Sequence, residues 1–215
     1  MVYVNVPLPL MELNTRGTVT FAGLAPETFF GNGVVLDIPK GSYDVINAAD
    51  LEQAAAVKEG DVVVINTGWH HKYSDSLEYY GEAPGLTEDA AKWLVDKKVK
   101  FVAVDTPFVD HPLATSMGPH RGGPQMKRLA GAYRAATGKD PAVEHGKWFI
   151  AEKTLAAAGI PVVVQVGGDV DDLKGRRATF TAMPWKLEHG DACPVRMVAM
   201  TDPGGKLRID EGKGD

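Results

Sequence analysis

Asp110, His111 and His120 are residues whose types and spacing could bind a metal ion. Asp110 and His111 are adjacent, and His120 follows within the same Gly- and Pro-rich stretch. Imidazole nitrogens and carboxylate oxygens are ligands of zinc and manganese. The alternative is that these side chains order a long loop by hydrogen bonding or contact another subunit. We favour this alternative, because it is the more ordinary role of such residues.

The chain lacks the patterns of a nucleophilic or phosphate-binding enzyme. No G-x-S-x-G elbow is present. Cys193 lies in a predicted strand with no sign of an activating base, so we expect a small buried hydrophobic residue. The sequence GGD at 167–169 lacks the spacing of a phosphate loop and predicts a glycine turn.

The elements that must position such residues are short apolar runs rich in β-branched residues. Runs of this kind, bounded by Gly, Asp or Pro, are typical of strands buried on both faces. They span residues 33–38, 61–67, 100–105, 160–166 and 194–200, and an alternating run at 178–183 predicts a strand with one wetter face.

Helices are expected between these strands. Residues 87–97 begin at Thr87, a capping residue, and residues 148–158 end before Gly159, a helix-stop signal. Residues 50–58 give a weaker helical pattern. The alternation of strands and helices predicts an α/β fold with helices packed on a largely buried sheet.

Composition and charge bound the class of protein. The 215 residues suit one domain, spanning 1–215, and 44% of them are hydrophobic. The net charge is −5 and no basic run is present, which argues against nucleic acid and anionic membranes as partners. With one cysteine, no apolar stretch of membrane-spanning length and no signal peptide pattern, we expect a cytoplasmic protein.

The segment from about residue 107 to 145 is a long arm or loop. It is rich in Gly and Pro and holds three of the six histidines. Segments of this length in compact domains are usually functional or form interfaces. We therefore expect an oligomer.

Several segments, taken in order, resemble the cyclase family of metal-dependent hydrolases, which includes bacterial kynurenine formamidase. They are FFGNGVVLDIP (29–39), GDVVVINTGWHHKY (60–73), PGLTEDAAKWLV (84–95), VDTPFVDHPLATSMGPH (104–120), AGIPVVVQVGGDVDDLKGRRATFTAMPW (158–185) and CPVRMVAMTDP (193–203). The resemblance implies a swivelling β/α/β-type fold, dimers or tetramers, and a zinc or manganese ion that activates water to open an amide or lactone.

The family's metal ligands do not match this sequence. The family carries H-x-[GS]-T-H-x-D-x-P near its start, and the best match is ELNTRGTVT, which puts Glu12, Arg16 and Thr18 at the ligand positions of a shortened N-terminus. A later His and Glu of the family correspond to Glu152 and Val164. Arg16 would repel a metal and Val164 offers no lone pair. We therefore expect no cofactor and no metal at these positions.

The resemblance also implies where a pocket would lie. If the family's geometry is kept, Glu12, Arg16 and Glu152 converge, and the guanidinium replaces the cation between two carboxylates. The plainer alternative is three surface charges. The segment holding Trp69 and His70 lines the pocket mouth in relatives, and His111 and His120 are further candidates.

Three functions remain open on this basis. The first, which we favour, is a catalytically degenerate, kynurenine formamidase-like subunit that partners an active paralogue or forms a homo-oligomer, with negligible hydrolysis when alone. The second is an active hydrolase of a cyclic amide, lactone or aryl formamide. The third is a module that binds a small aromatic ligand. A shared fold hosts many functions and does not decide among them.

Overall fold

The computed structural model describes residues 10–12, 23–118, 124–188 and 192–202. Its centre is an eight-stranded sheet in the order β10-β8-β2-β4-β6-β7-β1-β9. The strands of this sheet are β1 (Leu10–Glu12), β2 (Phe30–Asp37), β4 (Val62–Asn66), β6 (Phe101–Val104), β7 (Val162–Val164), β8 (Arg177–Thr181), β9 (Ala192–Pro194) and β10 (Val198–Met200). A separate parallel pair consists of β3 (Val45–Ile46) and β5 (Gly85–Leu86).

The four middle strands, β2, β4, β6 and β7, run parallel, and antiparallel strands flank them on both sides. Alternate residues of β4 enter different cores: Val62 and Val64 pack on one face, and Val63 and Ile65 on the other. The prediction of strands buried on both faces is confirmed. At β2, a Cβ on Gly33 would lie 2.0 Å from the carbonyl oxygen of Val62, so this close approach requires glycine.

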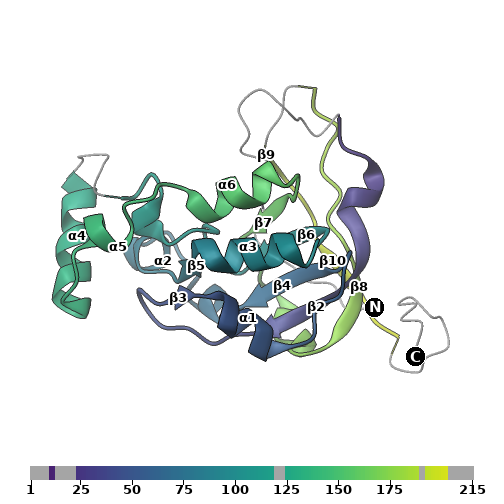
Figure 1. Ribbon diagram of the computed structural model, residues 1–215, viewed down its shortest axis with the longest axis horizontal. Helices are drawn as coiled ribbons and strands as arrows, with labels where there is room; N and C mark the ends of the chain where they lie inside the picture. Colours follow the sequence, from purple (N-terminus) through teal and green to yellow (C-terminus); the bar gives the residue numbers. More distant parts are fainter. Residues whose placement is uncertain (1–9, 13–22, 119–123, 189–191, 203–215) are drawn as a thin grey trace.

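Three helices cover one face of the sheet, as Figure 1 shows. They are α1 (Ala48–Ala54), α3 (Glu88–Asp96) and α6 (Ile150–Ala157). The side chain of Thr87 accepts a hydrogen bond from the amide of Ala90, so the expected N-cap of α3 is confirmed. α1 starts two residues earlier than predicted, because Asn47 and Asp50 form a capping box there.

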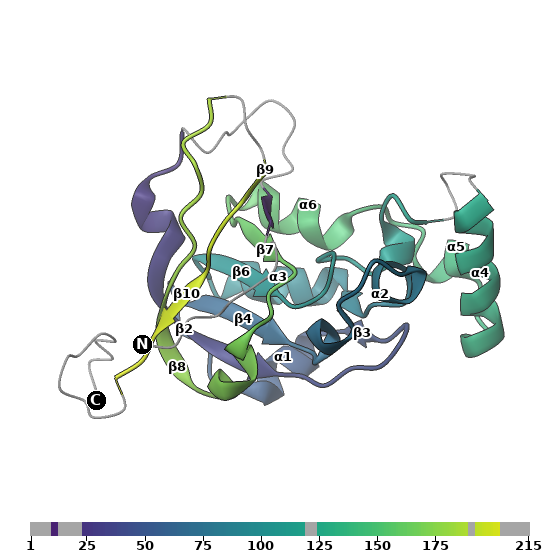
Figure 2. The ribbon, with the colours of Figure 1, turned by 180° about the vertical axis from the view of Figure 1, so that it is seen from behind.

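The predicted strand at residues 194–200 is wrong as a single element. Its residues divide between β9 and β10, which lie at opposite edges of the sheet. The chain passes from Pro194 to Val198 in four steps, which span at most about 15 Å. The sheet must therefore curl until its edges approach each other, and in Figure 2, seen from behind, β9 and β10 lie in front of α3 and α6.

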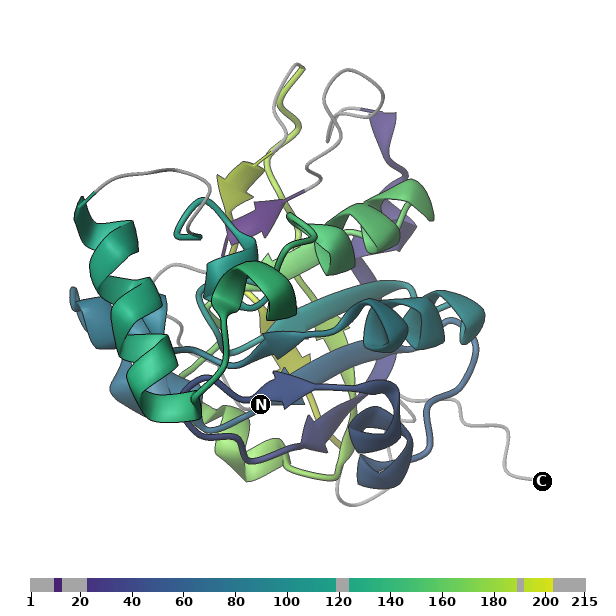
Figure 3. The same cartoon turned by 60° about the vertical axis from the view of Figure 1, so that its left-hand side comes forward.

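The segment from 107 to 145 holds more regular structure than a loop. It contains the short helix η4 (Pro112–Ala114), the helix α4 (Pro124–Thr137) and the helix α5 (Pro141–Glu144). α4 and α5 project from the body, with α4 at the far left of Figure 1 and turned toward the viewer in Figure 3. Leu129 and Tyr133 of α4 pack on Leu113. The role of this arm in subunit contacts stays a prediction.

The remaining short helices are η2 (Pro26–Phe29), η3 (Trp69–Lys72), α2 (Leu77–Gly81) and η6 (Asp169–Leu173). Within the described ranges, every helix is too short or too polar to traverse a bilayer. The mixed α/β class predicted from the sequence is confirmed.

Candidate functional site

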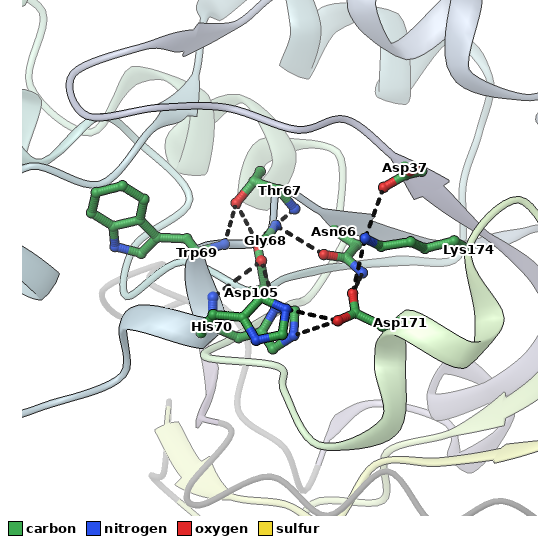
Figure 4. A network of polar contacts seen from close by, with 10 residues as sticks. Asp37, Asn66, Thr67, Gly68, Trp69, His70, Asp105, Asp171 and Lys174 are labelled. Atoms are coloured by element: carbon green, nitrogen blue, oxygen red, sulfur yellow. Dashed lines mark hydrogen bonds and ion pairs between the residues drawn. The ribbon is translucent and has the colours of Figure 1, made fainter.

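His70 is placed by a tight turn at the end of β4. Gly68 has a φ of 80°, a left-handed conformation that glycine adopts without strain, and it begins η3. The side chain of Asn66 accepts a hydrogen bond from the amide of Gly68, and the hydroxyl of Thr67 accepts one from the amide of Trp69. These bonds fix the direction in which the imidazole of His70 leaves the backbone (Figure 4).

Asp105 follows the neighbouring strand β6 and is fully buried. Its Oδ1 accepts hydrogen bonds from the amide and the hydroxyl of Thr67, at 3.0 and 2.7 Å. Its Oδ2 lies 3.3 Å from the amide nitrogen and 3.1 Å from Nδ1 of His70. The carboxylate thus orients the imidazole and places a proton on Nδ1, which leaves Nε2 with a lone pair.

Asp171 approaches the same imidazole from η6. Its Oδ2 lies 3.4 Å from Nε2 of His70 and 2.7 Å from Nε2 of His71. Its Oδ1 accepts a hydrogen bond of 2.8 Å from Asn66 and pairs with Lys174 at 3.1 Å. We call His70, His71, Asp105 and Asp171 the His70 cluster; Figure 4 shows how three separate loops bring it together.

Hydrogen bonds and neighbouring charges shift the pKa values of His70 and Asp171. The hydrogen bond to Asp105 raises the pKa of His70, against the opposing effect of burial. Partial burial works to raise the pKa of Asp171, but hydrogen bonds from Asn66 and Lys174 and the charge of His70 outweigh it and hold the pKa below its ordinary value. Asp171 therefore stays ionised at neutral pH.

A cavity of about 240 Å³ opens beside His70. Its other lining residues are Tyr73, Tyr79 and residues 165–168. The predicted glycine turn lies in this wall, where Gly168 has a φ of 66° and precedes η6. The same turn therefore forms the cavity wall and delivers Asp171 to His70.

The donor atoms of His70, His71 and Asp171 suit a divalent metal ion. Two imidazole nitrogens and one carboxylate oxygen lie within 4.8 Å of one another. Nε2 of His70 is buried and has no hydrogen-bond partner in the described part of the chain. Metal-bound histidines commonly donate their other ring N–H to a carboxylate, as Nδ1 does here to Asp105. These observations fit a zinc or manganese ligand set with a free coordination position.

The positions expected to be degenerate are only partly described. Arg16 and Thr18 lie outside the described residues, and of Glu12 the backbone alone is described, paired with Val162. Glu152 is buried in α6 and Val164 is buried in β7. The expected cluster of Arg16 with two glutamates therefore stays a prediction.

The other predicted pocket residues have different surroundings. Trp69 is buried, and its indole N–H donates to the carbonyl of Tyr79, so it supports the wall from inside. His120 lies outside the described residues. His111 is buried within the arm, where its ring contacts that of Tyr133. His145 is half-buried and stacks on His111.

Asp110, His111, Tyr133 and His145 form a second group, which we call the His111 cluster. The two imidazoles lie parallel, 3.8 Å apart between ring centres, and Nε2 of His145 lies 3.2 Å from the hydroxyl of Tyr133. Asp110 accepts hydrogen bonds from the amides of Ala151 and Glu152 and so caps α6. This use matches the loop-ordering role that the sequence favoured over a metal site.

Burial sets the protonation of the His111 cluster. Desolvation, followed by the nearby His145, lowers the pKa of His111 to about 3. Desolvation lowers the pKa of His145 to about 4 and raises that of Asp110 to about 6. Both imidazoles are therefore neutral at pH 7.

Sequence reasoning missed Asp105 and Asp171. A signal for Asp105 was present, because polar residues directly after neighbouring parallel strands meet at one edge of the sheet. Thr67 follows β4 and Asp105 follows β6, so they were bound to be close. No local pattern distinguishes Asp171 from its neighbours Asp169 and Asp172.

Comparison with known proteins supports the family predicted from the sequence. The protein family described as "Putative cyclase" matches residues 10–111. A search of curated proteins found no match. The cyclase resemblance is confirmed.

Solved structures share the cyclase-like fold. A potential metal-dependent hydrolase with cyclase activity has a TM-score of 0.62 and 20% identity, covering 90% of this chain and 77% of its own. Isatin hydrolase A from Ralstonia solanacearum has a TM-score of 0.66 and 18% identity, covering 89% and 70%. An isatin hydrolase bound to the product analogue thioisatinate gives 0.66 and 19%, covering 89% and 70%. These identities establish the fold alone.

The expectation that this cyclase-like chain has no cofactor is wrong. It rested on the ligand positions of the early motif and of Glu152 and Val164, whereas the structure gathers other donors, His70, His71 and Asp171, into a possible metal site. A structural neighbour is itself named as a metal-dependent hydrolase. The sequence argument failed because Asp171 lies far from His70 and His71 in the chain and only folding brings these donors together.

Proposed function

We propose that the chain is a metal-dependent hydrolase of a small cyclic amide or a related carbonyl compound. The observation that carries this proposal is His70, held by Asp105 through Nδ1, with a buried and unbonded Nε2 facing Asp171. The cavity beside this imidazole provides room for a small substrate. The isatin hydrolases among the structural neighbours support the substrate class by analogy.

His70, His71 and Asp171 would hold the metal. A bound divalent ion supplies Lewis-acid polarisation of a carbonyl and lowers the pKa of a bound water. Asp105 keeps the imidazole of His70 in one orientation and one tautomer. Asn66 and Lys174 fix the carboxylate of Asp171. In the overall reaction, a water oxygen bonds to the carbonyl carbon, the C–N or C–O bond of the ring breaks, and a proton passes to the leaving atom.

The competing hypothesis is the inactive subunit predicted from the sequence. It is favoured by Val164, a buried valine without a lone pair at a family ligand position. It predicts that added metal does not produce turnover and that an active paralogue is required. A small-ligand binding module is the third possibility, and it predicts binding without turnover.

The test is hydrolysis of isatin and N-formylkynurenine by the purified chain, with and without added manganese or zinc. The proposal expects turnover that chelation removes and that metal restores. Asp171→Asn should lose it, whereas Asp169→Asn, an exposed position in the same η6, should retain it. Absence of turnover in the wild-type chain under all metal conditions would refute the proposal.

A further inference from the structure

We propose that the carboxamide of Gln165 binds the substrate in the cavity beside His70. This inference rests on the proposed function and names a residue that determines which ligand the site accepts. Gln165 directly follows β7 and lines the cavity together with His70, Tyr73 and Tyr79.

The backbone of Gln165 has an unusual conformation. Its φ is 62°, and it is one of four non-glycine residues with positive φ in the described part of the chain. A side chain in this region is disfavoured, and such residues concentrate at functional sites when the surrounding structure holds them. Glycine would adopt this conformation without strain. The same cavity wall already contains two glycines, Gly167 and Gly168.

The conformation has a definite structural effect. In a regular strand, successive N–H groups point to opposite sides, but here two successive amides donate to the same neighbouring segment. The amide of Gln165 bonds to the carbonyl of Thr106 at 2.9 Å, and the amide of Val166 bonds to that of Val104 at 3.0 Å. The chain is turned out of the sheet toward the cavity, as a β-bulge turns a strand.

The side chain of Gln165 has no hydrogen bond within the described residues, although it is half-buried. The carboxamide can donate and accept, which matches an amide or carboxylate group of a ligand. The aromatic rings of Tyr73 and Tyr79, 5.3 Å apart and edge to face, supply an apolar side of the same cavity. A small planar ring carrying a carbonyl group satisfies both features.

The experiment compares Gln165→Gly, Gln165→Asn and a control, Lys98→Gly. Lys98 also has a positive φ, of 52°, but is exposed after α3 and away from the cavity wall. We expect Gln165→Gly to weaken thioisatinate binding about tenfold in calorimetry, equivalent to one lost hydrogen bond of about 1.4 kcal/mol. Its Tm should be unchanged or higher, because glycine relieves the strain. Gln165→Asn should lose less affinity, and Lys98→Gly none.

Binding is measured with and without added manganese, and isatin turnover is recorded in parallel. Equal thioisatinate affinity in wild type and Gln165→Gly, or no binding by the wild type, overturns the inference. A Tm several degrees lower in Gln165→Gly also overturns it, because the side chain would then serve packing. Failure of the proposed function appears differently, as thioisatinate binding by the wild type without isatin turnover.

Discussion

Both clusters hold two neighbouring imidazoles, but those of the His70 cluster also contact carboxylates, whereas those of the His111 cluster contact a tyrosine. Carboxylates raise the pKa of His70, while burial lowers the pKa of His111 to about 3 and that of His145 to about 4. The nearby Asp110 is engaged with the backbone of α6. The same residue types therefore give a carboxylate-bound site in one place and a neutral packing unit in the other.

The largest expected effect distinguishes the two buried carboxylates. Asp105→Asn should lower the free energy of unfolding by about 3 kcal/mol, because its amide would face N–H donors of Thr67 or His70. Asp110→Asn should cost less, about 1 kcal/mol: its amide would also face an N–H donor of α6, but a neutral side chain avoids the cost of burying charge that raises the pKa of Asp110 to about 6. Urea unfolding at pH 7 measures both, and equal losses would contradict the distinction.

The second-largest effect should be stabilisation by added metal, which should depend on the His70 cluster and not on the His111 cluster. Manganese or zinc at a hundred times its dissociation constant should stabilise the wild type by about 2.7 kcal/mol. His70→Ala should abolish this gain. His111→Ala should keep it, although the variant begins from a lower stability because a buried ring is lost. Thermal unfolding with and without metal measures this gain in stability. If His111→Ala also lost the gain, the metal would bind at the His111 cluster and the proposal for the His70 cluster would be contradicted.

His145 of the His111 cluster should make stability fall in mild acid. The folded-state pKa of His145, about 4, lies below the ordinary value of 6.5, so acid protonates the unfolded chain first. Stability from this residue is present above pH 6.5 and is lost as the pH falls toward 4. Relative to His145→Phe, the wild type should lose on the order of 1 kcal/mol per pH unit in this window. A constant difference between the two proteins would refute the assigned environment.

The smallest effect is expected on the exposed surface of the arm. Lys139 and Glu144 form an ion pair of 3.3 Å with both side chains exposed. Lys139→Ala should change the free energy of unfolding by less than about 0.5 kcal/mol, because water screens such a pair. A larger loss would mean that the arm depends on surface charge more than on the packing of Leu129 and Tyr133.

Local patterns were sufficient for much of the fold. The apolar run that became β4 specified a strand buried on both faces, because the residues that point to either side of the sheet are hydrophobic. Thr87 specified the start of α3 through its capping hydroxyl. The 14-residue helix α4 was missed, because the Gly and Pro residues around it outweighed its helical pattern.

The sequence predicted only part of the candidate site. His70 was a candidate because of the family segment in which it lies, but its partners are 35 and 101 positions away in the chain. The sequence by itself determined the strands buried on both faces and the glycine turn before Asp169. Only the tertiary structure decided which pair of histidines meets carboxylates and which meets a tyrosine. Protonation and metal affinity depend on distances across elements, and local sequence does not encode those distances.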